Sequence, residues 1–369
     1  MKQTLDKRNE KQKDAGMKWK EVPLGDVLSY EQPTKYIVQS EDYDDSYQTP
    51  VLTAGKSFIL GYTNETENIY ENLPAIIFDD FTADSKYVDF PFKVKSSAMK
   101  ILTCNPNMVD IRFAFYLMQT LKVDTEQHKR YWISKFSNIS VPLPPLPIQK
   151  RIAEILDAAD ALRKKDQELL KKYDELAQAI FIDMFGDPVK NEKGWEMKKI
   201  GQIVKSEDHL RVPIESAVRA TRQGQYPYYG ASGIIDCFDD YIFNGTRLLI
   251  GEDGANLLAR STPIAFLAHG KYWVNNHAHV LNSDNLSMLT YLEFWFNSIS
   301  LKPYITGSAQ PKLNGSKLME IEVPMPDKES LQSFDLANKS ILIQKNKVCP
   351  SNQLFQGILK NSFSGDLVS

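Results

Sequence analysis

Basic, amide and hydroxyl side chains gather at a few places along the chain, usually beside aromatic residues. Lysine and arginine bind phosphates, whereas arginine, asparagine, glutamine, serine, threonine and histidine hydrogen-bond to base edges in the grooves of DNA. In the second half of the chain they predict contact with double-stranded DNA at Arg219, Arg222, Gln223, Tyr226, Ser232, His277, His279, Gln310, Lys312 and Asn314. In the first half they predict contact at Thr53, Lys56, Ser57, Lys86, Lys129, Arg130 and Trp132. The alternative is that the aromatic residues pack in the core and that the other residues lie in ordinary solvated loops.

Metal binding is not expected, although His277 and His279 would share one face of a strand. Zinc in proteins takes three or four protein ligands, and no third candidate lies nearby in the sequence. The acidic pairs Asp79-Asp80 and Glu252-Asp253 resemble parts of a catalytic site, but each is more simply interpreted as a turn after an apolar run. The three cysteines have no metal-binding spacing.

Catalytic motifs for DNA modification are missing from the sequence. It contains no Asn-Pro-Pro-Tyr or Asp-Pro-Pro-Tyr segment that would stack on a flipped adenine. It also lacks a convincing glycine-rich loop for S-adenosylmethionine and a Walker-type phosphate loop. We therefore expect a binding protein whose chemistry is supplied by partner proteins.

The two halves of the sequence repeat one another. Trp19–Val27 is echoed by Trp195–Ile203, with the tryptophan, an aliphatic residue and a glycine in register. Further along, Ser134–Pro144 is echoed by Ser316–Pro326. Each half consists of short β-like runs with a few helical stretches between them. The pattern indicates one mixed α/β domain used twice.

A long helix is predicted for residues 148–185, because no glycine or proline interrupts this segment and its charges are interleaved. Its apolar residues recur at alternating four- and three-residue spacing, which is typical of a coiled-coil seam. The seam residues expected to meet a partner helix are Ile152, Ile155, Leu162, Leu169, Tyr173, Leu176 and Ile180. A second, distal helix should provide that partner, with a break at Pro350.

These patterns give a domain order and a fold class. The order is a mobile N-terminal tail at 1–18, a first globular domain at 19–146, a central spacer helix at 147–187, a second globular domain at 188–328 and a distal spacer helix at 329–369. The fold class is α/β (α+β), with two similar mixed α/β domains separated by long coiled-coil helices in a pseudo-two-fold arrangement. Such a pair could read equivalent surfaces of a duplex about one helical turn, roughly 34 Å, apart.

Four stretches together resemble a known family. They are the hinge and helix start Pro142–Leu156, the Phe185–Pro188 segment, the Gly194-Trp195 start of the second half, and Gln310–Leu313. Their order along nearly the whole chain is similar to that of the specificity subunit of Type I restriction-modification systems. The first half has Arg130–Ile133 where the second has the Gln-Pro-x-Leu stretch, so the resemblance implies different contacts there.

The resemblance implies two target recognition domains, each reading half of a bipartite asymmetric DNA site, and antiparallel spacer helices that dock two methyltransferase subunits. Restriction/translocase subunits would complete the assembly. This chain would be a non-catalytic subunit of a DNA adenine methyltransferase and restriction endonuclease complex. It would hold no cofactor, and S-adenosylmethionine, ATP and Mg would be bound by partner subunits. The alternative from another class is a non-DNA coiled-coil scaffold with two ligand-binding domains.

Composition sets the broad class. The 369 residues are 42% hydrophobic and 25% charged, which is typical of an ordinary soluble protein of two or three domains. A net charge of -3 neither requires nor excludes DNA, because binding depends on local patches. Without an apolar run at the N-terminus or about eighteen consecutive apolar residues elsewhere, neither secretion nor a membrane is expected. The expected location is the cytoplasm.

Overall fold

The computed structural model describes residues 19–54, 57–121, 131–307, 310–348 and 351–364. The chain forms two compact units: unit 1 is Met1–Gln167 with Cys349–Ser369, and unit 2 is Glu168–Val348. The predicted mobile tail at residues 1–18 lies outside the described residues.

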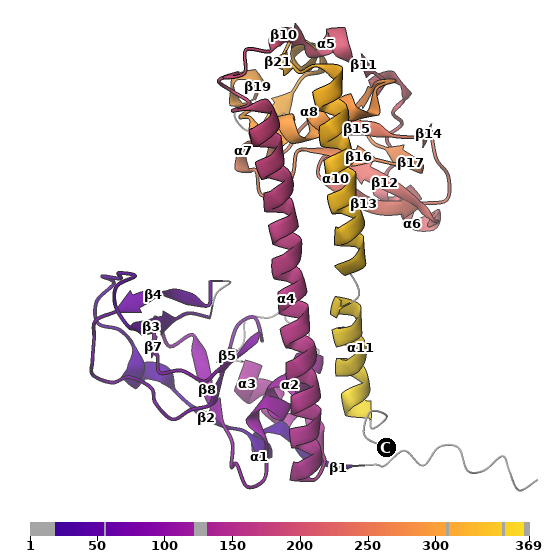
Figure 1. Ribbon diagram of the computed structural model, residues 1–369. Coiled ribbons are helices and arrows are strands. Elements are labelled where there is room, and N and C mark those ends of the chain that lie inside the picture. The colour runs from indigo at the N-terminus through magenta and orange to yellow at the C-terminus, as the bar shows by residue number, and fades with distance from the viewer. Residues whose placement is uncertain (1–18, 55–56, 122–130, 308–309, 349–350, 365–369) are drawn as a thin grey trace, which may run out of the picture. The chain divides into compact units, whose positions relative to one another are not determined.

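Unit 1 combines short strands with a few helices (Figure 1). Its elements are β1 (Lys20–Pro23), α1 (Leu24–Val27), β2 (Ser29–Glu31), η1 (Pro33–Tyr36), β3 (Thr49–Leu52), β4 (Ile59–Thr63), β5 (Ala75–Asp79), β6 (Ser85–Val88), β7 (Lys93–Val94), β8 (Met99–Thr103), α2 (Ile111–Thr120), α3 (Tyr131–Ser134), η2 (Phe136–Asn138) and β9 (Ser140–Leu143). The strands pair in the orders β2-β8-β5-β6, β4-β3-β7 and β1-β9.

The core of unit 1 follows from its two most apolar elements. Strand β5 is buried along its whole length, since only its last residue, Asp79, is polar. Helix α2 is capped at its N-terminus by Asp110, whose carboxylate accepts hydrogen bonds from the backbone N–H groups of Arg112 and Phe113. This helix covers one side of β5 and β6.

The described residues of unit 2 form more elements than those of unit 1. They are β10 (Glu196–Lys199), α5 (Ile200–Ile203), β11 (Lys205–Ser206), η3 (Asp208–Leu210), α6 (Ser216–Thr221), β12 (Tyr226–Gly230), β13 (Gly233–Phe238), β14 (Phe243–Asn244), β15 (Arg247–Gly251), α7 (Asn256–Ala259), β16 (Ala265–Ala268), β17 (Lys271–Val274), β18 (Ala278–Asn282), α8 (Leu286–Ser298), η4 (Lys302–Tyr304), β19 (Ile305–Thr306), β20 (Lys312–Leu313), α9 (Gly315–Met319) and β21 (Glu322–Met325). The strands pair in the orders β11-β18-β15-β16, β13-β12-β17-β14, β19-β20 and β10-β21.

The two units share one strand order. The sheet β2-β8-β5-β6 of unit 1 corresponds to β11-β18-β15-β16 of unit 2, and the closing pair β1-β9 corresponds to β10-β21. In each unit the sheet formed by the other hairpin, β4-β3-β7 in unit 1 and β13-β12-β17-β14 in unit 2, contains a parallel pair among its described strands, β3 with β7 and β12 with β17. The sequence repeat is therefore a repeat of the fold.

Helix α4 (Leu146–Phe185) is 40 residues long, where a helix over 147–187 was predicted. Up to Gln167 it belongs to unit 1, and beyond that residue it belongs to unit 2. In unit 1 it buries Ile152 and Leu156, and in unit 2 it buries Phe181.

The predicted seam of this helix is wrong at three positions. Leu162, Leu169 and Leu176 are 46%, 39% and 47% exposed, whereas a coiled-coil seam would bury them. Ile155, Tyr173 and Ile180 are half-buried, and Ile152 is fully buried. The reason is that α4 packs on the core of each globular domain as well as on another helix, and these cores select the buried face. Sequence spacing alone cannot report this second contact.

The distal segment is described as two helices, α10 (Lys328–Val348) and α11 (Ser351–Ser364), and Cys349 and Pro350 lie outside the described residues. In unit 2, Phe334 of α10 packs on Phe181 and Phe185 of α4 with ring centroids 5.5 and 5.4 Å apart. Lys345, near the other end of α10, forms an ion pair with Asp174. Helix α10 therefore runs antiparallel to this part of α4.

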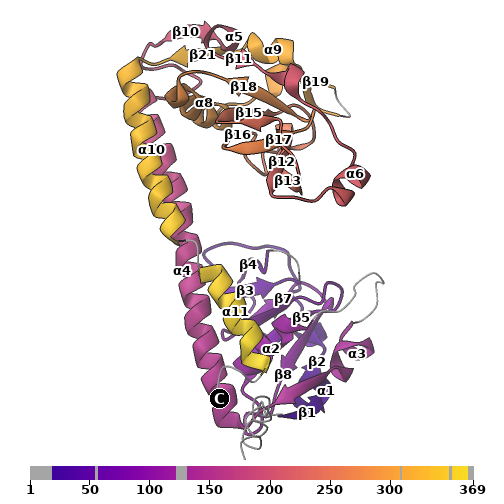
Figure 2. The same ribbon diagram turned by 90° about the vertical axis from the view of Figure 1, so that its right-hand side faces the viewer.

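Helix α11 completes the core of unit 1. Its Phe363 lies 5.4 Å from Phe113 of α2, measured between ring centroids, and Figure 2 shows the two helices side by side. The Arg163 guanidinium of α4 stacks 4.7 Å from the ring centroid of Phe355. No described helix is long and apolar enough to cross a membrane.

Candidate nucleic-acid interface

Several loops of unit 2 are joined by backbone contacts into one surface. The Glu252 N–H donates to the His277 carbonyl, and the Leu313 N–H donates to the Glu252 carbonyl, both at 2.8 Å. Gly251 packs so tightly that an added Cβ would lie 2.9 Å from the carbonyl oxygen of Ala231. We call this edge the unit 2 recognition surface, made of residues 230–235, 251–254, 275–278 and 310–314.

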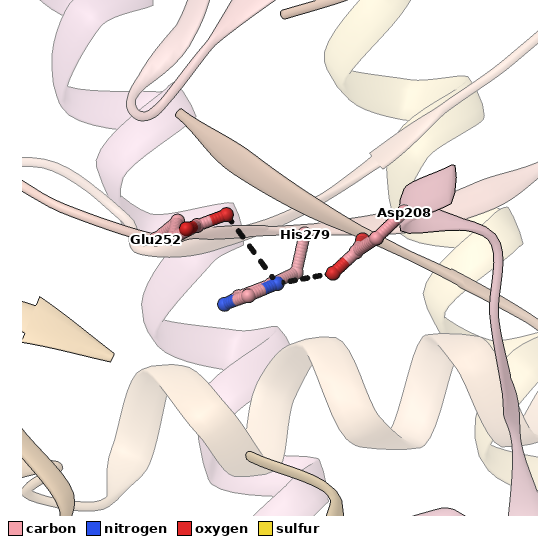
Figure 3. A group of neighbouring side chains, drawn as sticks. All are labelled: Asp208, Glu252 and His279. Carbon is pink, nitrogen blue, oxygen red and sulfur yellow. Dashed lines mark hydrogen bonds and ion pairs between the residues drawn. The ribbon is translucent and has the colours of Figure 1, made fainter. Parts of the chain in front are cut away.

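His279 supports this surface from beneath and is only 1% exposed (Figure 3). Its Nδ1 lies 2.6 Å from Oδ2 of Asp208 and 3.7 Å from Oε2 of Glu252. Its Nε2 lies 2.8 Å from the Leu313 carbonyl oxygen. The histidine thus joins η3, the loop after β15 and strand β20.

Two cations complete the network around the acids. Arg211 Nη1 lies 2.6 Å from Glu252, and its Nη2 lies 3.4 Å from Asp208. Lys312 Nζ lies 3.0 Å from the other oxygen of Glu252. Burial raises the pKa of both carboxyl groups, but these cations and the His279 ring outweigh it, so each pKa lies below its ordinary value. Both acids are therefore charged at neutral pH.

Asp208, Glu252 and His279 are close enough together to hold a metal ion. The chemistry of the group does not fit one. Both nitrogens of His279 face oxygen acceptors, which calls for an N–H on each and leaves no lone pair for a metal. Arg211 and Lys312 already neutralise the carboxylates. The group is better described as a buried ion network.

The outer side of the recognition surface carries polar side chains. Ser232 and Gln310 are exposed. The Lys312 side chain is 48% exposed, and that of His277 is 50% exposed with its Nδ1 2.9 Å from both carboxylate oxygens of Asp253. These four predicted residues are brought together on one edge of the unit.

Two further predicted residues of this region support the surface without lying on its outer side. His279 is buried, so its prediction as a DNA contact is wrong, because both of its ring nitrogens are used within the protein. Asn314 is half-buried and donates from Nδ2 to Thr306 Oγ1 at 3.2 Å.

Arg219 belongs to a second group, at the base of the β12–β13 hairpin. Its guanidinium stacks 4.7 Å from the Tyr228 ring centroid and donates to Asp236 at 3.0 Å, and its side chain is 15% exposed. Burial in this stacked, paired position makes it a structural residue rather than an available phosphate contact.

Arg222, Gln223 and Tyr226 lie in the same group. Arg222 remains 43% exposed although it stacks on Phe238 and pairs with Asp239 at 2.7 Å. Gln223 is exposed and donates to the Arg219 carbonyl at 2.9 Å. Tyr226 is half-buried and packs edge-on against Tyr241. Among the three, Arg222 is the cation that could still reach a phosphate or base.

Unit 1 builds a simpler version of the buried network. Lys100 Nζ lies 3.1 Å from Asp80, and both side chains are almost completely buried. The Tyr131 N–H donates to the Asp80 carbonyl at 3.2 Å, and the Trp132 N–H donates to the Asp80 carboxylate at 2.9 Å. Trp132 is 1% exposed and packs on Phe78, so its prediction as a DNA contact is wrong. Its large ring fills the core.

The remaining predicted residues of unit 1 are only partly described. Ser57 is exposed, Thr53 is half-buried, and the 46% exposed Lys86 pairs with Asp84 at 3.1 Å. Lys56, Lys129 and Arg130 lie outside the described residues.

The sequence matches the family described as "Type I restriction modification DNA specificity domain" over residues 17–172 and 192–351. The chain belongs to this family. Each of the two matched stretches contains one copy of the repeated α/β domain. As a Type I specificity subunit, the chain serves DNA-sequence recognition, and such subunits are non-catalytic and assemble with other restriction-modification subunits.

Curated Type I specificity subunits resemble this chain along most of its length. It is 32% identical over 362 residues to the specificity subunit of the Type I restriction enzyme EcoR124I/EcoR124II of Escherichia coli, covering 87% of each chain. It is 23% identical over 370 residues to the MjaVIII specificity subunit of Methanocaldococcus jannaschii, covering 88% of this chain and 86% of that one.

A solved structure of the same family shows the same fold. It is the crystal structure of a Type I restriction-modification S subunit from M. genitalium, with a TM-score of 0.61 and 15% identity. The likeness covers 95% of this chain and 98% of that one.

Sequence reasoning about this specificity subunit missed the acids and cations beneath the surface, notably Asp80, Lys100 and Glu252. Asp80 and Glu252 were interpreted as turn residues. One signal could have found them: each acid stands two residues after the last apolar residue of the equivalent strand, Phe78 in β5 and Ile250 in β15.

Proposed function

We propose that the two units each read one half of a bipartite, asymmetric site in double-stranded DNA, and that the spacer helices dock two methyltransferase subunits. The docked subunits would bring S-adenosylmethionine to an adenine in each half-site. Restriction/translocase subunits, with ATP and Mg, would join the same assembly and act in the cytoplasm.

The observation that carries this proposal is a repeated framework with unlike residues at its edge. In both units the backbone carbonyl of the acid that follows the central strand accepts a hydrogen bond from a residue far along the chain. In unit 1 the Tyr131 N–H donates to the Asp80 carbonyl, and in unit 2 the Leu313 N–H donates to the Glu252 carbonyl. The side chains at these equivalent places differ: Tyr131 and Leu313 are both fully buried, and in unit 2 the exposed Lys312 lies next to Leu313. Two like frameworks that carry unlike residues favour two different short DNA sequences.

Docking of partner subunits is supported by the outward row on α4. Leu162, Leu169 and Leu176 recur every seven residues and are each more than a third exposed. A leucine row at this spacing is the pattern that a partner helix packs against. The non-DNA scaffold is the rival, and it would use the same row without any duplex.

Mapping methylated adenines tests the proposal. The chain is co-expressed with its methyltransferase partner, and genomic DNA is read for a two-part methylated sequence. Replacing residues 195–326 with the second domain of another specificity subunit should change one half of that sequence and leave the other unchanged. Changes in both halves would refute independent readers. Absence of sequence-preferring, salt-sensitive duplex binding by the complex would favour the scaffold.

A further inference from the structure

The β12–β13 hairpin of unit 2 exposes two neighbouring isoleucines. Ile234 is 58% exposed and Ile235 is 53% exposed. The strand pairing joins Tyr228 to Asp236 and Tyr229 to Ile234, so Ile235 is the extra residue of a β-bulge. Bulges re-aim side chains and are over-represented beside functional sites. Here the bulge turns both apolar side chains toward solvent.

Unit 1 has the same feature at the equivalent place. In the β3–β4 hairpin Val51 pairs with Gly61 and Leu52 with Ile59, which leaves Leu60 as the extra residue. Ile59 is 39% exposed and Leu60 is 43% exposed. The same bulge therefore presents an exposed aliphatic pair in both units, although the surrounding loops differ.

The pair in unit 2 belongs to the recognition surface. Gly230 lies against Ile235, since an added Cβ would be 3.1 Å from its Cγ2 and 3.6 Å from Nδ2 of Asn275. Asn276 and His277, on the same loop as Asn275, are exposed. An apolar pair thus stands beside hydrogen-bonding side chains, within one small area.

The major groove of DNA also presents an apolar group beside hydrogen-bonding groups. Its floor offers hydrogen-bond donors and acceptors, and the thymine C5-methyl group is its apolar feature. A protein partner is a poorer match, because a stable protein interface buries about 1,200–2,000 Å² and two isoleucines cannot provide that area.

We propose that Ile234 and Ile235 read a thymine methyl group in the half-site bound by unit 2, an inference that rests on the proposed function. The proposal is confined to unit 2. In unit 1 the acidic run Glu41–Asp45 lies beside β4, with the Asp44 N–H donating to the Tyr62 carbonyl at 3.1 Å, and its charge would repel phosphate near Leu60.

The test replaces thymine by deoxyuridine, which lacks only the methyl group, one position at a time in the mapped site. With the complete methyltransferase complex, at least one substitution in one half-site should weaken binding about fourfold, the value expected for one buried methyl group. The doubly substituted chain I234S/I235S should bind the normal site more weakly and should lose that sensitivity. The conservative chain I234V/I235V should keep it.

The matched control is I59S/L60S in unit 1, which should retain the sensitivity removed by I234S/I235S. Wild-type complex that binds every uracil-substituted site normally would overturn the inference, and so would I234S/I235S protein that folds and keeps the sensitivity. In both of these cases sequence-preferring binding persists, so the proposed function survives. Loss of all sequence preference in the wild-type complex would instead refute the proposed function, and the inference with it.

Discussion

Lys100 and His279 occupy equivalent positions in the two units. Lys100 pairs across the sheet with Phe78, and His279 pairs with Ile250. Phe78 stands two residues before the buried Asp80, and Ile250 stands two residues before the buried Glu252. In unit 1 this produces one ion pair, Lys100 with Asp80 at 3.1 Å. In unit 2 the histidine faces two carboxylates and a backbone carbonyl, within a larger network. The position is a common support for two unlike surfaces.

Replacing His279 by alanine should strongly destabilise unit 2. The substitution leaves the Asp208 carboxylate without its closest partner and removes the hydrogen bond to the Leu313 carbonyl. Breaking a buried pair in this way costs about 3–5 kcal/mol, which urea unfolding of the variant would measure. His277→Ala is the control, since half of that side chain is exposed and little change is expected. Equal stability of the two variants would contradict a supporting role for His279.

Glu293 should make unit 2 less stable as pH rises from 4.5 to 7. Glu293 lies on α8 and lines a cavity with residues of α4 and α10. Desolvation there raises the pKa of this carboxyl from its ordinary 4.5 to about 7, although it accepts a hydrogen bond from the Leu267 N–H at 3.2 Å. Between these values the folded state holds a proton that the unfolded state releases, so stability falls with rising pH and then levels off above about 7.

Glu293→Gln should remove this decline, because the amide is neutral at every pH. Urea unfolding at several pH values measures it, and Glu329→Gln on an exposed turn of α10 is the matched control. If the free energy of unfolding falls equally with pH in E293Q and in the wild type between pH 4.5 and 7, another group is responsible for the decline.

Arg219 and Arg222 should respond differently to alanine substitution. Arg222→Ala should weaken binding to one half-site by about 1–3 kcal/mol if it reads a base, with a small effect on stability, because this side chain is 43% exposed. Arg219→Ala should lower the unfolding temperature more, since it removes a stacked and paired side chain that is 15% exposed. Duplex binding and thermal unfolding of both variants separate the two roles. A larger stability loss at Arg222 would be inconsistent with these environments.

Glutamate at Leu169 and Leu176 should weaken the methyltransferase complex about tenfold or more while leaving the chain folded. Both side chains are exposed on α4 within unit 2, so a charge there is tolerated in the isolated chain but not in an apolar interface. Lys171→Ala on the same helix, also exposed, is the control and should change assembly little. Pull-down and analytical ultracentrifugation measure the effect. If assembly is unchanged, the methyltransferase subunit docks somewhere other than on this leucine row.

The sequence predicted the repeated framework well, because each part of it has a local signal. The start of helix α4 is an example: Gln149 is buried and donates to the Pro144 carbonyl at 2.8 Å, which explains the Pro-rich hinge followed by glutamine. Local patterns could not separate Trp132 in the core from Lys312 at the surface. That distinction depends on which strand lies beneath each loop.

The predicted seam of α4 differs from the structure for a related reason. A heptad pattern shows that one face will find an apolar partner, and Leu162, Leu169 and Leu176 satisfy it as well as Ile152 does. The choice between an internal and an external partner is made by the globular cores, whose residues are distant in sequence. In unit 2 the core contributes Tyr291, stacked 5.6 Å from Phe181.

Unit 1 takes its last helix, α11, from the far end of the polypeptide, whereas unit 2 is one continuous segment. During synthesis on the ribosome, unit 2 can therefore finish folding while unit 1, begun earlier, still waits for Phe355 and Phe363 to emerge. A premature stop codon after Val348 would remove α11 and leave the core of unit 1 incomplete, while unit 2 would keep its whole segment. Genetic lesions in the codons of α11 should accordingly be scored by the half-site that the proposed function assigns to unit 1.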